Sequence, residues 1–218
     1  KEVKYFDYNI SKKILSNLSF ELTKCQNRVL SEINSDLGSK TRMFRILQGD
    51  VGSGKTIVSF LAAANVIESG SQCALMAPTE ILAKQHYDLA KKIFDNTKVN
   101  IEFLTGKTES SIKKKITKNL ENKNIDFIIG THSLFQKKIK FNKLGLVLID
   151  EQHKFGVKQR SELAKKGGLN CDVLLLSATP IPRTMMMSFY GDMDVSKITE
   201  KPAKRKKIIT LSKPENKT

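Results

Sequence analysis

Short apolar runs alternate along the chain with segments in which apolar residues recur every three or four positions. Several runs are continuously apolar, such as LGLVLI and DVLLLS, which is typical of strands buried on both faces of a parallel sheet. We expect strands at 44–48, 72–77, 100–104, 126–130, 144–149, 172–177 and 207–211. Between strands, one helical face carries Leu82, His86, Leu89 and Ile93. Another carries Ile112, Ile116 and Leu120.

This alternation predicts an α/β fold, with a mainly parallel β-sheet and helices on both of its faces. Residues 20–200 are expected to form one domain. Residues 1–19 read as a lead-in with a short amphipathic helix, and the basic, proline-containing residues 201–218 read as a linker.

Charge adds a class of partner to this picture. The 218 residues include 38 Lys and Arg against 22 Asp and Glu, a formal net charge of +16, which favours a polyanion such as nucleic acid. The lysine clusters at 113–115 and 137–140 are candidates for electrostatic attraction or for plain solvated surface. No apolar run approaches the roughly 18 residues of a membrane span, and no secretory signal is recognisable. With three widely spaced cysteines, these features predict a cytoplasmic protein without a membrane partner, and we expect a monomer.

Residues 49–56, GDVGSGKT, follow an expected strand and precede an expected helix. This order is the one in which a glycine-rich loop and a helix N-terminus hold the phosphates of a nucleotide. Lys55 is expected to reach the β- and γ-phosphates, and the Thr56 hydroxyl to ligate Mg²⁺. The loop therefore predicts ATP and Mg²⁺ as cofactors, with a set of nucleotide-binding residues: Gly49, Asp50, Val51, Gly52, Ser53, Gly54, Lys55 and Thr56.

An acidic pair, Asp150 and Glu151, ends the run GLVLI. Ligands of parallel sheets gather at the carboxyl ends of the strands, so this pair should lie beside the phosphate loop. We expect Asp150 to hold Mg²⁺ and Glu151 to deprotonate the attacking water. Lys55, Asp150 and Glu151 are the expected catalytic residues.

Further segments narrow the class: APTEILAKQH at 77–86, LTGK at 104–107, GTH at 130–132, DEQHKFGVKQR at 150–160 and SATPIPRT at 177–184. With GDVGSGKT, in this order, the chain resembles the RecG family of bacterial ATP-dependent DNA helicases, within superfamily 2. The resemblance extends over about residues 20–211. It implies the first RecA-like motor domain, a P-loop NTPase fold, of an enzyme that remodels branched DNA such as replication forks and Holliday junctions in recombination and repair.

The resemblance also assigns roles around the nucleotide. Gln26 is implied to contact the adenine, with Phe20 stacking near the base; a buried polar residue on a core-facing helix is the alternative for Gln26. Roles that couple hydrolysis to movement fall on Gln152, His153, Ser177, Thr179 and Arg183. A structural histidine is the alternative for His153 and the preferred interpretation for His86, and a surface salt bridge is the alternative for Arg183.

Contacts to the DNA backbone are implied for three loops, through Pro78, Thr79, Thr105, Gly106, Thr131 and His132. Small hydroxyl residues and backbone N–H groups suit phosphate contacts, which carry no base identity. The choice of DNA over RNA rests on the resemblance alone.

Motors of this kind place ATP between two RecA-like domains, and the RecG family adds a wedge domain that grips the branch point. We therefore expect the chain to be one part of a longer protein, in which a second RecA-like domain and a wedge domain are its partners. Alone, it should bind ATP–Mg²⁺ weakly and hydrolyse it slowly or not at all. The alternatives are the motor of a transcription–repair coupling translocase and a non-catalytic nucleic-acid-binding module. Gln152 favours the RecG family over the translocase, and the intact Lys55, Asp150 and Glu151 argue against the module.

Overall fold

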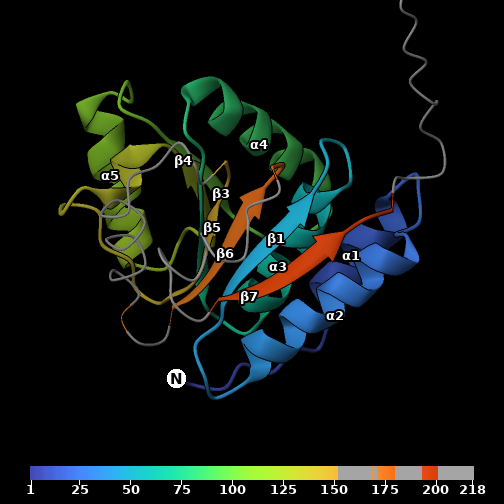
Figure 1. Cartoon of the computed structure of the whole chain (residues 1–218). Coiled ribbons are helices and arrows are strands. Elements are labelled where there is room, and N and C mark those ends of the chain that lie inside the picture. Colours follow the sequence, from blue (N-terminus) through green and yellow to red (C-terminus); the bar gives the residue numbers. More distant parts are fainter. Residues whose placement is uncertain (152–167, 169–170, 180–192, 201–218) are drawn as a thin grey trace, which may run out of the picture.

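A computed structural model describes residues 1–151, 168, 171–179 and 193–200. These residues form a seven-stranded, all-parallel sheet in the order β3-β4-β2-β5-β6-β1-β7 (Figure 1). The strands are β1 Phe44–Gly49, β2 Gln72–Met76, β3 Ile101–Leu104, β4 Phe127–Gly130, β5 Leu144–Ile149, β6 Asp172–Ser177 and β7 Asp194–Ile198. Because all strands run the same way, the loops that follow them lie along one edge of the sheet.

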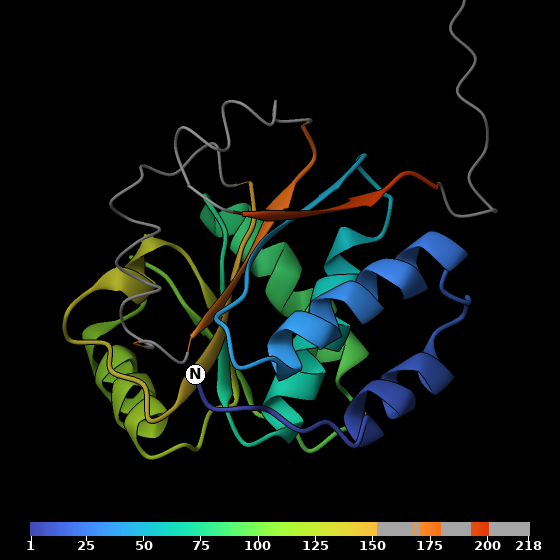
Figure 2. The ribbon, with the colours of Figure 1, turned by 60° about the horizontal axis from the view of Figure 1, so that its bottom comes forward.

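Helices cover both faces of the sheet, as the sequence predicts. They are α1 Asn9–Asn17, α2 Lys24–Gly38, α3 Lys55–Glu68, α4 Glu80–Ile93 and α5 Ser110–Glu121, with a 3-10 helix, η1, at His132–Phe135. Buried residues of α1 to α4 share one hydrophobic cluster with one face of the sheet. Residues of α5 and η1 share a second cluster with the opposite face. In Figure 2 the blue helices α1 and α2 lie on one side of the sheet and the yellow-green α5 lies on the other. None of the described helices is both long and apolar enough to cross a membrane.

Six of the seven expected strands are confirmed as β1 to β6. The seventh expected strand, 207–211, lies outside the described residues, and β7 was not predicted. This strand is short and mostly polar: Asp194 and Lys197 are exposed, while Ser196 and Ile198 are buried. Among the described strands it pairs with β1 alone, at the sheet edge. One face of an edge strand is solvated, so the continuous apolar run of a central strand is missing from its sequence.

The predicted helical faces are partly wrong. Leu89 is 40% exposed and Ile112 is 49% exposed. On α4 the buried positions are Ala83, His86 and Ala90. The small alanines let the helix approach the sheet closely, so the buried face turns away from the larger Leu89.

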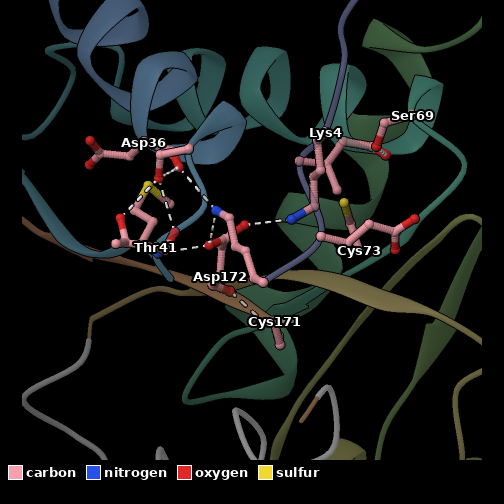
Figure 3. A network of polar contacts seen from close by, with 12 residues as sticks. Lys4, Asp36, Thr41, Ser69, Cys73, Cys171 and Asp172 are labelled. Atoms are coloured by element: carbon pink, nitrogen blue, oxygen red, sulfur yellow. Dashed lines mark hydrogen bonds and ion pairs between the residues drawn. The ribbon is translucent and has the colours of Figure 1, made fainter. Parts of the chain in front are cut away.

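The N-terminal segment is fixed to the edge of the sheet at which the strands begin, opposite the loops that follow the strands. Asp172, at the start of β6, is fully buried and accepts from Lys1 Nζ at 2.7 Å and Lys4 Nζ at 2.6 Å. It also accepts from the backbone N–H of Met43 at 2.7 Å. Figure 3 shows Lys4 and Asp172 pointing toward one another from separate segments. The short helix expected in the lead-in is present as α1, and its Ile14 is buried in the core. Residues 1–19 are thus packed onto the sheet and its helices.

Candidate active site

The phosphate loop joins the end of β1 to the start of α3 and depends on its glycines. Gly52 and Gly54 have φ values of 79° and 90°, which side chains disfavour. A Cβ on Gly49 would lie 2.5 Å from Ser53 Oγ, and one on Gly54 would collide with the Gln26 amide. The loop therefore curls tightly at the N-terminus of α3, where the unpaired N–H groups of the first turn favour an anion.

Lys55 is the first residue of α3, and its side chain reaches back to the loop. Its Nζ donates to Gly49 O at 2.6 Å and to Asp50 O at 3.0 Å. Burial lowers the pKa of Lys55, while the charges of Asp150, Glu151 and Asp50 oppose that shift. The acidic pair after β5 and the loop after β1 therefore act on the same ammonium group, as the strand-end argument predicts.

The loop offers polar atoms that fit a phosphate and a metal ion. Ser53 Oγ is buried and has no hydrogen-bond partner among the described residues, so an anion in the loop would satisfy it. The described residues hold no group of three His, Cys, Asp or Glu side chains suited to a metal. Mg²⁺ is commonly held by one carboxylate together with substrate phosphates and water, which fits the single carboxylate of Asp150 and the hydroxyl of Thr56.

Asp150 and Glu151 form a tight turn at the end of β5. The Asp150 N–H donates to Met76 O at 2.9 Å, which ties the turn to β2. Asp150 Oδ1 accepts from the Glu151 N–H at 2.9 Å. Glu151 has a φ of 48°, a left-handed conformation that costs a residue other than glycine about 1–2 kcal/mol. Such strain is concentrated at functional sites, which supports a specific role for the Glu151 position.

His86 is a site residue that the sequence analysis missed. From α4, its Nε2 lies 2.7 Å from Asp150 Oδ2, and the side chains of His86 and Asp150 are only 10% and 14% exposed. In the sequence, the neighbours of His86 at helical spacing are apolar, which indicates packing. Only the proximity of α4 to the end of β5, set by the β2–β5 pairing, brings the two side chains together.

The residues expected around the adenine differ in position. Gln26 is 2% exposed. Its Nε2 donates to Ser53 O at 2.8 Å, and its Oε1 accepts from the Thr23 N–H at 2.9 Å within a capping box. Gln26 thus holds the phosphate loop directly, and its adenine contact stays a prediction. Phe20 is 47% exposed and presents a free ring surface.

The expected coupling residues are described only at the end of β6. Ser177 is buried, and its Oγ donates to Thr179 O at 2.9 Å in a local turn. Gln152, His153 and Arg183 lie outside the described residues.

The expected nucleic-acid loops follow three adjacent strands, β2, β4 and β3. Thr79 caps α4 by accepting from the Leu82 N–H. Thr105 and Thr131 are buried, and the Thr105 hydroxyl accepts from the Lys107 N–H at 3.3 Å. Gly106 and His132 are exposed, and Pro78 is half-buried. Thr105 and Thr131 therefore shape the loops, and the exposed surface consists of Thr79, backbone, imidazole and lysine.

Two lysine clusters face each other beside these loops. Lys113, Lys114 and Lys118 of α5 line one surface depression together with Lys137 and Lys138 after η1. Lys113 Nζ also bonds Gln136 Oε1. We call this set of five lysines the basic groove.

Comparisons with known proteins agree with this geometry. A profile of the DEAD/DEAH box helicase family matches residues 23–188. The ATP-dependent DNA helicase RecG of Aquifex aeolicus is 49% identical over 205 residues, covering 94% of this chain and 26% of that protein. RecG of Thermotoga maritima is 47% identical over 211 residues, covering 97% and 27%.

A solved structure of RecG bound to a three-way DNA junction superposes with a TM-score of 0.83 at 43% identity, covering 94% of this chain and 27% of that one. The chain spans about a quarter of the length of the relatives it matches. The match confirms the predicted RecA-like motor fold. Its extent, together with the phosphate loop and acidic pair on one sheet edge, shows that the chain belongs to the DEAD/DEAH box helicase family.

Proposed function

We propose that this chain is the first motor domain of an ATP-dependent DNA helicase that remodels branched DNA. One observation carries the proposal: the phosphate loop and the acidic pair act on the same Lys55 ammonium at one edge of the sheet. Relatives named RecG, 47% to 49% identical, support remodelling of branched DNA over a transcription-coupling motor.

The residues divide the chemistry of ATP hydrolysis. Lys55 exchanges the carbonyls of Gly49 and Asp50 for the β- and γ-phosphates, and so neutralises charge that develops there. Asp150 and Thr56 would hold Mg²⁺, which would supply positive charge to offset the negative charge of the phosphates. Glu151 accepts the proton of the attacking water. Asp150 accepts hydrogen bonds from His86 and from the Glu151 N–H and would also hold the metal. The role of proton acceptor therefore falls to Glu151 and not to Asp150.

The loops after β2, β3 and β4 bind the DNA backbone in this proposal. Their exposed groups are backbone atoms, Thr79, His132 and Lys107, which suit phosphate rather than base edges. A motor that moves along DNA of any sequence needs such contacts. The relative solved with a three-way junction supports branched DNA as the substrate.

The second RecA-like domain and the wedge domain are proposed partners in a longer chain. An arginine supplied by the second domain would raise turnover by roughly 10³–10⁵-fold, so the isolated domain is expected to hydrolyse ATP slowly. Cytoplasmic location and a monomeric state stay predictions.

The test is ATP hydrolysis by the full-length protein with and without a synthetic fork. We expect strong stimulation by forked DNA, loss of hydrolysis in Lys55→Ala, and unwinding of the fork that requires ATP. A wild-type protein that neither hydrolyses ATP nor moves a branch point would refute the proposal.

A further inference from the structure

We propose that His86 is a positioning residue, through which helix α4 links the nucleic-acid loops to the metal-binding carboxylate of Asp150. The inference rests on the proposed function and adds to it a specific contact between its two halves. His86 touches neither ATP nor DNA in this proposal; it acts through Asp150.

The first step is the hydrogen bond itself. An ionised carboxylate only accepts hydrogen bonds, so the 2.7 Å contact requires that His86 Nε2 carries a proton and donates to Asp150 Oδ2. Asp150 Oδ1 accepts from the Glu151 N–H at 2.9 Å. Within the described part of the chain each oxygen thus has one donor, which fixes the plane of the carboxylate and leaves a lone pair on each oxygen for a metal-bound water or the metal.

The second step is the place of His86 on α4. The helix begins directly after Pro78 and Thr79, in the first of the nucleic-acid loops, and Thr79 is its N-cap. Glu80, in its first turn, pairs with Lys107 of the neighbouring loop at 3.0 Å. His86 lies seven residues after Thr79, which is about 10 Å along a helix. One rigid element therefore touches two nucleic-acid loops at its start and the metal carboxylate two turns later.

The third step is the packing that holds the imidazole. His86 is 8% exposed, and its ring lies edge-on to Phe60 of α3 at a centroid distance of 6.5 Å. Phe60 belongs to the helix that starts in the phosphate loop. Because the imidazole of His86 is packed against Phe60, it has little room to reorient by itself. A small shift of α4 relative to α3 would therefore change the distance and angle of its hydrogen bond to Asp150.

The test compares three variants of the full-length protein. His86→Ala removes the donor, and His86→Gln keeps an N–H at a similar distance from the backbone. Leu89→Ala is the matched control, since Leu89 lies three residues further on the same helix and is 40% exposed. Binding of a fluorescent ATP analogue is titrated with Mg²⁺, and ATP hydrolysis is measured with and without forked DNA.

Removal of a group that orients a metal ligand commonly costs 10–100-fold in metal affinity. For His86→Ala we expect roughly a tenfold or larger rise in the Mg²⁺ concentration at half-maximal nucleotide binding, and a smaller stimulation by DNA at unchanged DNA affinity. His86→Gln should recover most of both values, and Leu89→Ala should match the wild type.

Two outcomes would overturn the positioning of Asp150 by His86. One is a His86→Ala variant in which both the Mg²⁺ midpoint and the DNA stimulation are unchanged, and the other is a His86→Gln variant as defective as His86→Ala. The second outcome would assign His86 to packing. A change in the Mg²⁺ midpoint with unchanged stimulation would overturn the link to the nucleic-acid loops. If the wild type itself shows no DNA-stimulated hydrolysis, the proposed function fails first, which separates that failure from this one.

Discussion

Two halves of one sheet edge differ in how they use their side chains. After β1, β5 and β6, the nucleotide half presents half-buried groups with defined partners, such as Lys55 on two carbonyls and Asp150 between His86 and Glu151. After β2, β3 and β4, the nucleic-acid half buries Thr105 and Thr131 and exposes Thr79, backbone and charge. Chemistry requires atoms fixed to fractions of an ångström, whereas binding a uniform backbone requires only a shaped surface with the right charge.

Glu151→Gln in the full-length protein should affect the chemistry of the nucleotide half and leave binding by the nucleic-acid half unchanged. The amide keeps the shape of the side chain but accepts no proton, so hydrolysis should fall by roughly 10²–10⁴-fold. Affinities for ATP and for forked DNA should stay unchanged, because the loop and the nucleic-acid half are intact. Steady-state kinetics measure the hydrolysis, and equilibrium titrations measure the affinities for ATP and for forked DNA. Normal turnover in Glu151→Gln would show that Glu151 is not the proton acceptor.

A change at the opposite edge should weaken both halves together. Asp172→Ala leaves the buried Lys4 without its carboxylate, and breaking such a pair costs about 3–5 kcal/mol in the free energy of unfolding. Denaturant unfolding of the 218-residue chain measures the loss. Asp194→Ala is the control, since that carboxylate is 70% exposed and 3.8 Å from Arg45, and should change stability by less than about 0.5 kcal/mol. Equal effects of the two changes would contradict the anchoring role of Asp172.

The basic groove tests how far the nucleic-acid half extends. Lys137→Ala with Lys138→Ala should weaken forked-DNA binding by the full-length protein and lower the slope of log affinity against log salt by about two. ATP affinity should not change. Lys12→Ala with Lys13→Ala removes the same charge from α1, on the other face of the sheet, and should leave the slope nearly unchanged. If both pairs lower the slope equally, the lysines act as a diffuse field.

The smallest expected effect concerns strain in the nucleotide half. Glu151→Gly should be about 1 kcal/mol more stable than Glu151→Ala, because only glycine adopts a φ of 48° without a steric cost. Both variants should lack hydrolysis. Thermal unfolding of the two chains gives the difference, and equal stability would mean that residue 151 relaxes away from its left-handed conformation.

Much of the nucleotide half was predictable because its signals are local. The glycine spacing around Lys55 and the acidic pair after LGLVLI each imply a geometry within a few residues. His86 was not predictable, since its partner is 64 positions away and its neighbours in sequence indicate packing. The buried Thr105 and Thr131 show the reverse problem: a hydroxyl in a loop motif gives no sign of whether it faces the ligand or its own backbone.

The strand order also sets when each half is able to fold. The strands β2, β3, β4 and β5 pair with one another and come from residues 72–149, whereas in the described sheet β1 lies between β6 and β7. At about 5–20 residues per second, the ribosome needs roughly 6–30 seconds to make the residues between β1 and its neighbours. During this time β1 lacks the strands that flank it in the sheet, whereas β2 to β5 are already able to pair, so we expect the phosphate loop to be the last part of the edge to take shape.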